Sequence, residues 1–496
     1  MLIIQGAWFD VYKKMNKSLK INAILNTVRM SLKIIFPLIT FPYVARILGT
    51  QRLGQINYVQ SIINYMVLIA DLGISTYAVR ECAKIRSNKE KTEMFCNEIF
   101  SINIITTIIT YILFYMGILF IYSLHQYRKL LLIMSISVMF NAIGSDWINS
   151  VFEDFFYTTI RSLFIQIFNL VCLFIFVHKE NDIYIYAVLL SLNTILMGVI
   201  NFVYCRRYVH LKFVIPKHVW NHIKAMMVFF ANTVAVTLYC DSDTIMLGTM
   251  CDAYYVGLYA VAVKIYTVFK NIGAAVIVVT IPRLANYYQE DTDKWKNLII
   301  QIVEVFTLFL PPLVTGIFVL ARPIIIFLGG NQYLQAMPAL KILSLSLLVA
   351  LYSGIFTNCI NITQNKEKIN LVATICAATI NILLNIFIIP VMQHNGAAIT
   401  TLIAEITVVI VCCCLNKDIW QIIMSKSYIL IILLQAVIGC FIIVIIHRIV
   451  MFFFDSIIFE VVFTVLSSIL AYFVILILFR NKYVMNLINK FRNPLC

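Results

Sequence analysis

The chain has 496 residues, of which 62% are hydrophobic and 12% are charged, and its mean hydropathy is +0.92. A soluble domain carries about 25% charged residues, so this composition excludes a soluble globular protein. The formal net charge is +15, but the Lys and Arg residues are spread over many loops. A nucleic-acid-binding protein gathers them in one exposed stripe, so nucleic acid is not an expected partner.

Apolar runs recur from near Leu19 to Phe479. A helix needs about 20 mostly apolar residues to cross a membrane, and these runs predict about 14 crossings. We therefore expect an all-α, polytopic membrane protein. The expected spans, in chain order, are 20–45, 55–79, 97–122, 129–151, 157–177, 183–205, 223–249, 254–280, 298–320, 335–360, 368–391, 396–415, 427–447 and 457–479.

Positive charge is concentrated in every second loop. With both termini on one side, about 26 of the 38 Lys and Arg residues fall on that side and about 7 on the other. Cytoplasmic loops retain Lys and Arg because moving positive charge across the membrane is unfavourable. The bias therefore predicts cytoplasmic N- and C-termini. No cleavable signal peptide is expected, and Met15 is an alternative start.

A short internal repeat supports the number of spans. Leu48-Gly49-Thr50 recurs as Leu247-Gly248-Thr249, Gly54 as Gly257, and Arg80 as Arg283. Internal duplication is common in transporters, with the substrate site between the copies. The copies begin at spans one and seven, so they share one orientation. The expected organisation is a cytoplasmic leader at 1–19, an N-terminal six-helix lobe at 20–205, a cytoplasmic linker at 206–222, a C-terminal six-helix lobe at 223–415, two additional helices at 427–479 and a cytoplasmic tail at 480–496.

The first span carries polar side chains at Asn22, Asn26, Arg29 and Lys33. Spacings of four, three and four residues place all of them on one helical face. Two cations one turn apart repel each other, so they need an anion or a water-filled cavity. Asn26, Arg29 and Lys33 are therefore candidate substrate-binding residues. The alternative is that both cations reach the headgroups at the cytoplasmic interface.

The eighth span adds Lys264, Lys270 and Asn271 as candidate cavity residues. Lys264 and Asn271 share one face, and Lys270 is displaced by about a third of a turn. Lys264 lies well inside the apolar run, where a position at the interface explains it less easily.

Three carboxylates, Asp71, Glu304 and Glu405, lie within the expected spans. A carboxylate in a membrane pairs with a cation, caps a helix, or carries a coupling proton or Na⁺. Structural pairing is the commoner outcome. The coupling-ion and ion-pair roles both stay open for these residues.

Motifs of catalysis and metal binding are absent from the sequence. The chain has no G-x-x-x-x-G-K-[ST] loop, no H-E-x-x-H, and no Asp five positions after a His. None of the 13 Cys residues forms a C-x-x-C pair, and most lie inside apolar spans, as small hydrophobic residues do. We expect no enzyme activity, no catalytic residue, no metal site and no cofactor.

Distinctive motifs occur near the ends of several spans. They are Phe41-Pro42-Tyr43-Val44-Ala45-Arg46-Ile47-Leu48-Gly49, Ala70-Asp71-Leu72-Gly73 with Ala78-Val79-Arg80-Glu81, Asp243-Thr244-Ile245-Met246-Leu247-Gly248, Val256-Gly257-Leu258-Tyr259 with Ile281-Pro282-Arg283-Leu284, and Asn381-Ile382-Leu383-Leu384-Asn385, Ile389-Pro390 and Gly396-Ala397-Ala398. Together they resemble motifs of bacterial polysaccharide flippases of the Wzx type. These flippases form the polysaccharide transporter branch of the MOP (multidrug/oligosaccharidyl-lipid/polysaccharide) exporter superfamily. The similarity spans nearly the whole chain.

The resemblance implies two six-helix lobes in a V with two extra C-terminal helices. It implies that the protein moves undecaprenyl-pyrophosphate-linked O-antigen or capsule repeat units from the cytoplasmic to the outer leaflet by alternating access. Basic residues of helices one and eight, Arg29, Lys33 and Lys264, would bind the pyrophosphate by charge-assisted hydrogen bonds, as in related flippases. Coupling to a proton or Na⁺ gradient is typical of the superfamily. Expected partners are the lipid-linked glycan, the bilayer of a bacterial inner membrane, and the polysaccharide polymerase and chain-length machinery.

Two other functions stay open. A multidrug or cation exporter of the same superfamily should have an acidic and aromatic cavity, whereas the cavity expected here is basic. A membrane-embedded polysaccharide polymerase or glycosyltransferase commonly carries a large external loop or a soluble catalytic domain, and every expected loop in this chain is short.

Overall fold

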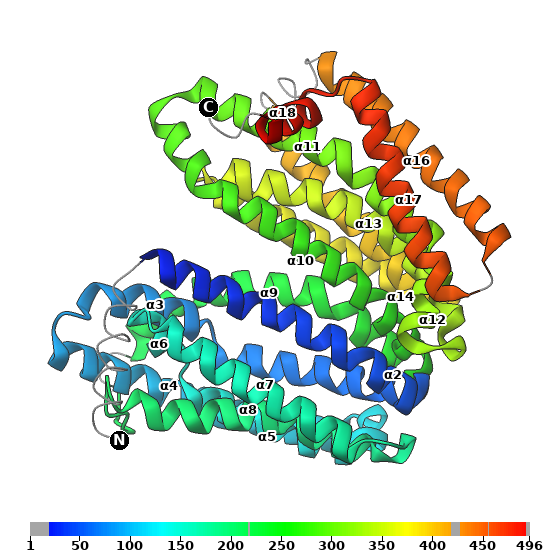
Figure 1. The fold of residues 1–496 in the computed structure, drawn as a ribbon. Coiled ribbons are helices and arrows are strands. Elements are labelled where there is room, and N and C mark those ends of the chain that lie inside the picture. The colour runs from blue at the N-terminus through cyan, green and yellow to red at the C-terminus, as the bar shows by residue number, and fades with distance from the viewer. Residues whose placement is uncertain (1–18, 217–218, 418–426, 455, 493–496) are drawn as a thin grey trace, which may run out of the picture. The chain divides into compact units, whose positions relative to one another are not determined.

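The computed structural model describes residues 19–216, 219–417, 427–454 and 456–492, with the backbone alone for residues 19–34, for Ser427 and for part of the C-terminal helix. Every regular element in these ranges is helical, so the expected all-α membrane fold is confirmed (Figure 1). Packing divides the chain into two units, the first ending at Gly257 and the second beginning at Leu258.

The first unit contains the N-terminal helices. They are α2 (Leu19–Asp71), α3 (Ile74–Ile85), α4 (Lys89–Phe120), η1 (Tyr122–Tyr127), α5 (Arg128–Gly144), α6 (Trp147–Val151), α7 (Phe155–Phe176), η2 (Glu180–Asp182), α8 (Ile183–Cys205), α9 (Val219–Met250) and the first turn of α10 (Ala253–Glu290).

The second unit contains the rest of α10 and the C-terminal helices. They are α11 (Thr292–Val319), α12 (Ala321–Gly329), η3 (Asn331–Ala336), α13 (Met337–Gly354), the π-helical η4 (Ile355–Ile362), α14 (Glu367–Leu415), α16 (Ser427–Phe453), α17 (Ile457–Leu478) and α18 (Lys482–Arg492).

The described helices account for the expected number of spans. Twelve helical segments in the described ranges are long and apolar enough to cross a membrane. One of these segments includes most of α2, a helix of 53 residues, and another is α14, a helix of 49 residues. At 1.5 Å per residue these would run about 75–80 Å, more than twice the hydrocarbon thickness of about 30 Å. Each is interrupted once, at Gly49 (φ 70°) and Gln393 (φ 46°), so each provides two spans and the prediction of about 14 is confirmed.

Helix α9 packs within the first unit, against α2 and α3. The turn between α2 and α3 makes this approach close, because a Cβ added at Gly73 would fall 2.7 Å from the backbone nitrogen of Phe230 on α9. Gly73 also has φ 76°, a left-handed conformation that favours glycine. The second lobe expected from the sequence begins at residue 223, within α9, whereas the second packing unit begins at Leu258. The two divisions are of different kinds, and the six-helix lobes stay a prediction.

Two glycines related by the internal repeat lie against each other in the first unit. A Cβ added at Gly54 on α2 would fall 1.7 Å from the carbonyl oxygen of Ala253, and one added at Gly257 would fall 2.0 Å from that of Thr50. Neither position therefore accepts a side chain. Small residues allow such close helix packing in membranes, where there is no hydrophobic driving force between helices.

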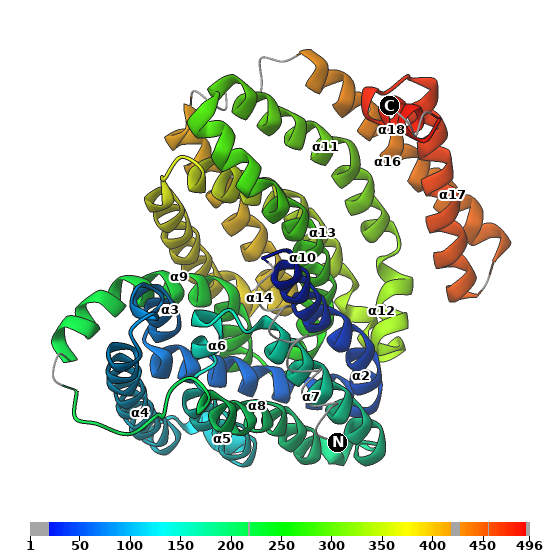
Figure 2. The same ribbon diagram turned by 60° about the vertical axis from the view of Figure 1, so that its left-hand side comes forward.

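In the second unit, α16 and α17 form an antiparallel pair, and α16 packs along α11 (Figure 2). The Tyr472 hydroxyl of α17 donates a hydrogen bond to the Leu308 carbonyl of α11 at 2.7 Å. The outer faces of this pair are apolar and exposed, with Leu430 at 69% and Leu470 at 66% exposure. Helices that expose so much apolar surface are suited to contact with lipid.

The loop between α10 and α11 ends in a charged cap. The Asp291 side chain accepts hydrogen bonds from the backbone nitrogens of Asp293 and Lys294, both at 3.1 Å, which satisfies free donors at the start of α11. These bonds, with that from Lys294 the largest cause, hold the pKa of the Asp291 carboxyl below its usual range.

Candidate functional site

The candidate residues Asn26, Arg29 and Lys33 lie in the N-terminal half of α2. The helical backbone there keeps the spacing that places them on one face. Their side chains lie outside the described residues, so their role as cavity residues stays a prediction.

The other three candidate cavity residues, Lys264, Lys270 and Asn271, lie on α10. Asn271 is exposed, whereas Lys264 and Lys270 are half-buried. The Lys270 ammonium forms an ion pair with Glu405 of α14, with Nζ 2.7 Å from Oε1. Two residues singled out separately in the sequence therefore come together within the second unit.

Glu405 is the centre of a buried polar cluster. Its side chain is 2% exposed, and it accepts hydrogen bonds from the hydroxyls of Tyr266 at 2.7 Å and Ser353 at 3.3 Å. Lys270 also donates to the Tyr266 hydroxyl, at 3.1 Å. A buried carboxylate is tolerated only when a cation and several donors satisfy it, and this cluster supplies both.

The cluster has two chemical properties that matter in a membrane. The Lys270–Glu405 pair is electrically neutral as a unit, so it lies within the apolar span at lower cost than either charge alone. The Lys270 side chain is 32% exposed, so one face of the pair is open to a further group. An anion that contacts Lys270, or a proton that neutralises Glu405, would weaken the pair.

Glu304 of α11 forms a second buried pair. Its Oε2 lies 2.6 Å from Lys482 Nζ on α18, and the Tyr483 hydroxyl donates to the same oxygen. The Lys482 ammonium also lies 4.1 Å from the centre of the Tyr428 ring, a cation–π contact. These contacts attach α18 to α11, although the sequence predicts only a tail after residue 480.

Asp71 occupies the end of α2. Its carboxylate accepts hydrogen bonds from the Ser75 hydroxyl at 2.5 Å and from the Ser75 backbone nitrogen at 3.3 Å. These bonds fix the first turn of α3. In the Ala70-Asp71-Leu72-Gly73 motif, Leu72 and Gly73 both have positive φ, so the motif forms the sharp turn between the two helices.

Sequence reasoning missed two buried polar groups in the first unit. Arg161 of α7 has a side chain 3% exposed, pairs with Asp146 at 2.9 Å, and lies over the Tyr157 ring. Asp154 accepts hydrogen bonds from the hydroxyls of Tyr204 at 2.7 Å and Tyr208 at 2.6 Å. Arg161 could have been found in the sequence, because it is an Arg inside an apolar run. The contacts of Asp154 could not, because its two tyrosine partners lie about 50 positions away in the chain.

In the described parts of the chain, no three His, Cys, Asp or Glu side chains are grouped so as to hold a metal ion. Buried polar clusters of the kind seen at Glu405 and Glu304 can bind a proton or stabilise the fold.

The chain is similar to a known protein family and to a named transporter. The model of the family described as "Polysaccharide biosynthesis protein" matches residues 19–288, more than half of the chain. A protein of Escherichia coli (strain K12) named "Putative O-antigen transporter" is 25% identical over 396 residues, which cover 78% of this chain and 94% of that protein.

Two solved structures share the fold. Lipid II flippase MurJ, in an inward closed conformation, has a TM-score of 0.75 at 18% identity, covering 93% of this chain and 100% of that one. An inward-facing multidrug resistance MATE family transporter of the MOP superfamily has a TM-score of 0.59 at 13% identity, covering 81% and 99%. Residues 19–288, more than half of the chain, match one family model, and the chain therefore belongs to the polysaccharide biosynthesis protein family.

Proposed function

We propose that this membrane protein transports polysaccharide precursors. Specifically, it translocates undecaprenyl-pyrophosphate-linked oligosaccharide repeat units of O-antigen or capsule from the cytoplasmic to the outer leaflet by alternating access. The family match over residues 19–288 carries the proposal. Similarity to a protein named as an O-antigen transporter, over 78% of this chain, supports it.

Such a cargo has a specific physical need. Its lipid tail is stable in the bilayer, but its pyrophosphate and sugars are not, because burying an unpaired charge costs several kcal/mol or more. The protein must therefore offer cations in a wet, sheltered path. In this proposal Arg29, Lys33 and Lys264 bind the pyrophosphate, and Asn26, Lys270 and Asn271 line the path for the sugars.

Glu405 is our candidate for the coupling site. It is buried, and its cation Lys270 is partly exposed, so a proton reaching Glu405 would release Lys270 toward the cargo. Asp71 and Glu304 are weaker candidates, because the first caps α3 and the second attaches α18 to α11. The proposal therefore predicts that Glu405 matters most for coupling.

The setting of the protein follows from its proposed task. We place it in a bacterial inner membrane with both termini in the cytoplasm, where the Lys- and Arg-rich loops would lie. The polysaccharide polymerase and the chain-length machinery would receive its product. In this scheme the protein moves its cargo without changing a covalent bond, so it is a transporter and not an enzyme.

A multidrug or cation exporter is the alternative that the MATE-like fold keeps open. A cationic drug would be attracted to Glu405, but that carboxylate is already paired with Lys270. A cation cargo would have to displace an internal ammonium from a 2.7 Å ion pair, whereas an anionic cargo would approach the same ammonium favourably.

The proposal is tested in cells that depend on this chain for surface polysaccharide. Arg29→Ala and Lys264→Ala should each reduce surface polysaccharide by about 10- to 100-fold, because each removes a hydrogen bond to a charged group worth about 1.5–3 kcal/mol. Lipid-linked repeat units should accumulate on the cytoplasmic side. Immunoblots of the membrane fraction check that each variant is inserted.

Two controls make the test specific. Lys129→Ala removes an exposed Lys of α5 and should leave surface polysaccharide unchanged. Lys264→Arg keeps the charge and should restore part of the transport. Normal surface polysaccharide in both alanine variants would show that cations of helices one and eight do not carry the cargo.

A further inference from the structure

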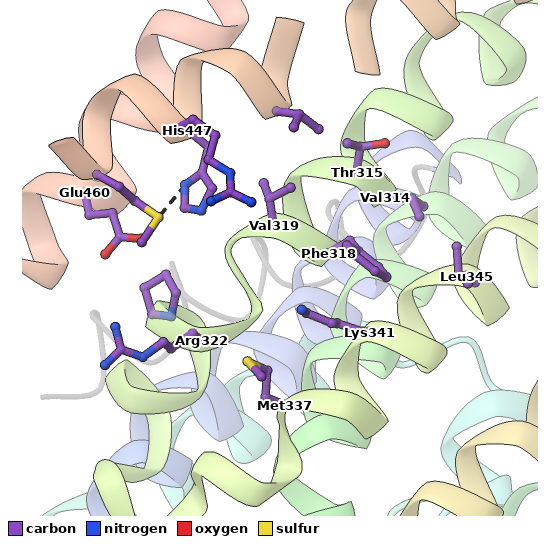
Figure 3. A pocket seen from close by; sticks show the side chains of 14 residues that line it. Val314, Thr315, Phe318, Val319, Arg322, Met337, Lys341, Leu345, His447 and Glu460 are labelled. Atoms are coloured by element: carbon purple, nitrogen blue, oxygen red, sulfur yellow. Dashed lines mark ion pairs between the residues drawn. The ribbon is translucent and has the colours of Figure 1, made fainter. Parts of the chain in front are cut away.

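The second unit contains a cavity of about 620 Å³ that the transport proposal does not use. Its lining residues come from five helices, and Figure 3 shows their side chains. α11, α12 and α13 form one side, and α16 and α17 form the other. The lining residues are Val314, Thr315, Phe318, Val319, Arg322, Pro323, Met337, Lys341, Leu345, Val444, His447, Arg448, Met451 and Glu460.

Positive charge dominates this cavity. Arg322, Lys341 and Arg448 line it, with Glu460 as the one carboxylate among the lining residues. Glu460 lies beside His447, with Oε1 3.9 Å from Nδ1, and both residues are 8% exposed. Among the described residues, none of the three cations forms an ion pair with a carboxylate.

The cations are held where a ligand can reach them. Arg322 and Arg448 are exposed, and Lys341 is half-buried. The Lys341 ammonium lies 5.0 Å from the centre of the Phe318 ring and extends into the cavity from α13 (Figure 3). This cation–π contact holds the charge in place without neutralising it.

The rim of the cavity is apolar and exposed. Leu345 is 44% exposed and Met451 is 45% exposed. Beyond the cavity, Phe327 of α12 and Phe459 of α17 are 57% and 53% exposed. A basic cavity bordered by such residues matches the boundary of a bilayer, where phosphate headgroups meet acyl chains.

The position of the cavity along α11 and α16 indicates on which side of the membrane it lies. It lies at the ends of α11 and α16 that precede the turns to α12 and α17. The loop at the other end of α11, near residues 283–296, belongs to the Lys- and Arg-rich side that we predict to be cytoplasmic. The cavity therefore faces the outer leaflet.

The volume indicates the size of the occupant. At about 620 Å³, the cavity is much larger than the space of about 30 Å³ that one water molecule occupies in the liquid. A free phosphate ion would fill only a small part of this space, whereas a glycerophosphate headgroup with the first carbons of its chains would fill much of it.

We propose that this cavity binds the phosphate headgroup of an anionic phospholipid of the outer leaflet. Arg322, Lys341 and Arg448 contact the phosphate oxygens, and the acyl chains lie along the exposed faces of α16 and α17. The bound lipid joins the α16–α17 pair to α12 and α13. None of the lining residues is a candidate cargo residue, and the proposal does not depend on the identity of the cargo.

Binding of phosphatidylglycerol to the purified full-length protein tests the proposal. The protein is titrated in detergent with phosphatidylglycerol or with phosphatidylcholine of the same acyl chains, and bound lipid is counted by native mass spectrometry. Each Lys or Arg near a headgroup strengthens binding about fivefold. The double variant Arg322→Gln/Arg448→Gln should therefore weaken phosphatidylglycerol binding by about 25-fold.

A matched control removes the same charge elsewhere. Arg128→Gln/Lys129→Gln changes two exposed cations at the start of α5 in the first unit and should leave binding unchanged. Lys341→Gln is a milder second variant, for use if the double variant does not fold, and should weaken binding about fivefold.

Three results would overturn the proposal. The first is unchanged phosphatidylglycerol affinity in Arg322→Gln/Arg448→Gln or Lys341→Gln. The second is equal binding of phosphatidylcholine, which would mean that the acyl chains alone are recognised. The third is displacement of phosphatidylglycerol by an equimolar amount of farnesyl pyrophosphate, which would assign the cavity to an isoprenoid pyrophosphate. None of these measurements uses transport, so they fail or succeed independently of the proposed function.

Discussion

Removing one partner of the Lys270–Glu405 pair should have an asymmetric effect on stability. Lys270→Met leaves Glu405, which is 2% exposed, as a buried carboxylate without its cation. Breaking a buried pair in this way costs about 3–5 kcal/mol. Glu405→Gln leaves Lys270, whose side chain is 32% exposed and can turn toward water, so its cost should be only about 1–2 kcal/mol.

The double variant Lys270→Met/Glu405→Gln separates the pair from its surroundings. It removes both charges, and Gln still accepts hydrogen bonds from Tyr266 and Ser353. We expect it to be more stable than Lys270→Met alone, with an interaction energy of about 2–3 kcal/mol in the double-mutant cycle. The reason is that a buried, unpaired carboxylate is worse than a neutral polar group.

Unfolding of the detergent-solubilised protein by heat or by denaturant gives the order of the three variants. The expected order of stability is Glu405→Gln, then the double variant, then Lys270→Met. Equal losses in the two single variants would contradict the predicted asymmetry between the two buried partners. Additive losses in the double variant would show that the two side chains are not energetically coupled.

Three more predictions follow from contacts within single units. Gly54→Ala should prevent stable insertion, because its Cβ would fall 1.7 Å from a backbone carbonyl, whereas Gly117→Ala, with nothing within 4 Å, should be tolerated; membrane immunoblots compare them. Lys482→Met should loosen α18 and expose it to protease, but with a smaller stability loss than Lys270→Met, since Lys482 is 45% exposed and Tyr483 still donates to Glu304. The pKa of the Asp291 carboxyl is lowered in the folded protein. The carboxylate therefore stabilises the fold above the ordinary Asp pKa of about 4, and this stabilisation is lost as pH falls through the lowered pKa. Thermal unfolding of Asp291→Ala, measured against pH, should lack this part of the pH dependence.

The spans could be predicted because each depends on local composition. A helix that crosses a bilayer satisfies its own backbone and needs only a long apolar run, so boundaries read from hydropathy agree with α7 and α8 to within a few residues. The joined helices α2 and α14 differ from the expected separate spans. Their connections are short enough for the helix to continue, with one residue breaking it each time.

The candidate site could be predicted in its parts but not in its pairing. Lys270 and Glu405 are each unusual in an apolar run, which is a local signal. Their contact joins positions 135 apart, and no spacing rule reaches that far. The same limit applies to Glu304, whose cation Lys482 comes from a C-terminal segment that had no predicted element.

Hydropathy and charge along the sequence were enough to predict a helical chain that crosses a membrane many times, has a charge bias between two sides, and carries cations in several of its spans. These properties follow from hydration energies, which act on each segment separately. The pairing of these charges depends on the packing of the helices: Lys270 forms an ion pair with Glu405, whereas Lys341 lies over the Phe318 ring. That distinction depends on distances of a few ångströms between helices, because the energy of a charge in an apolar medium is set by its nearest partner.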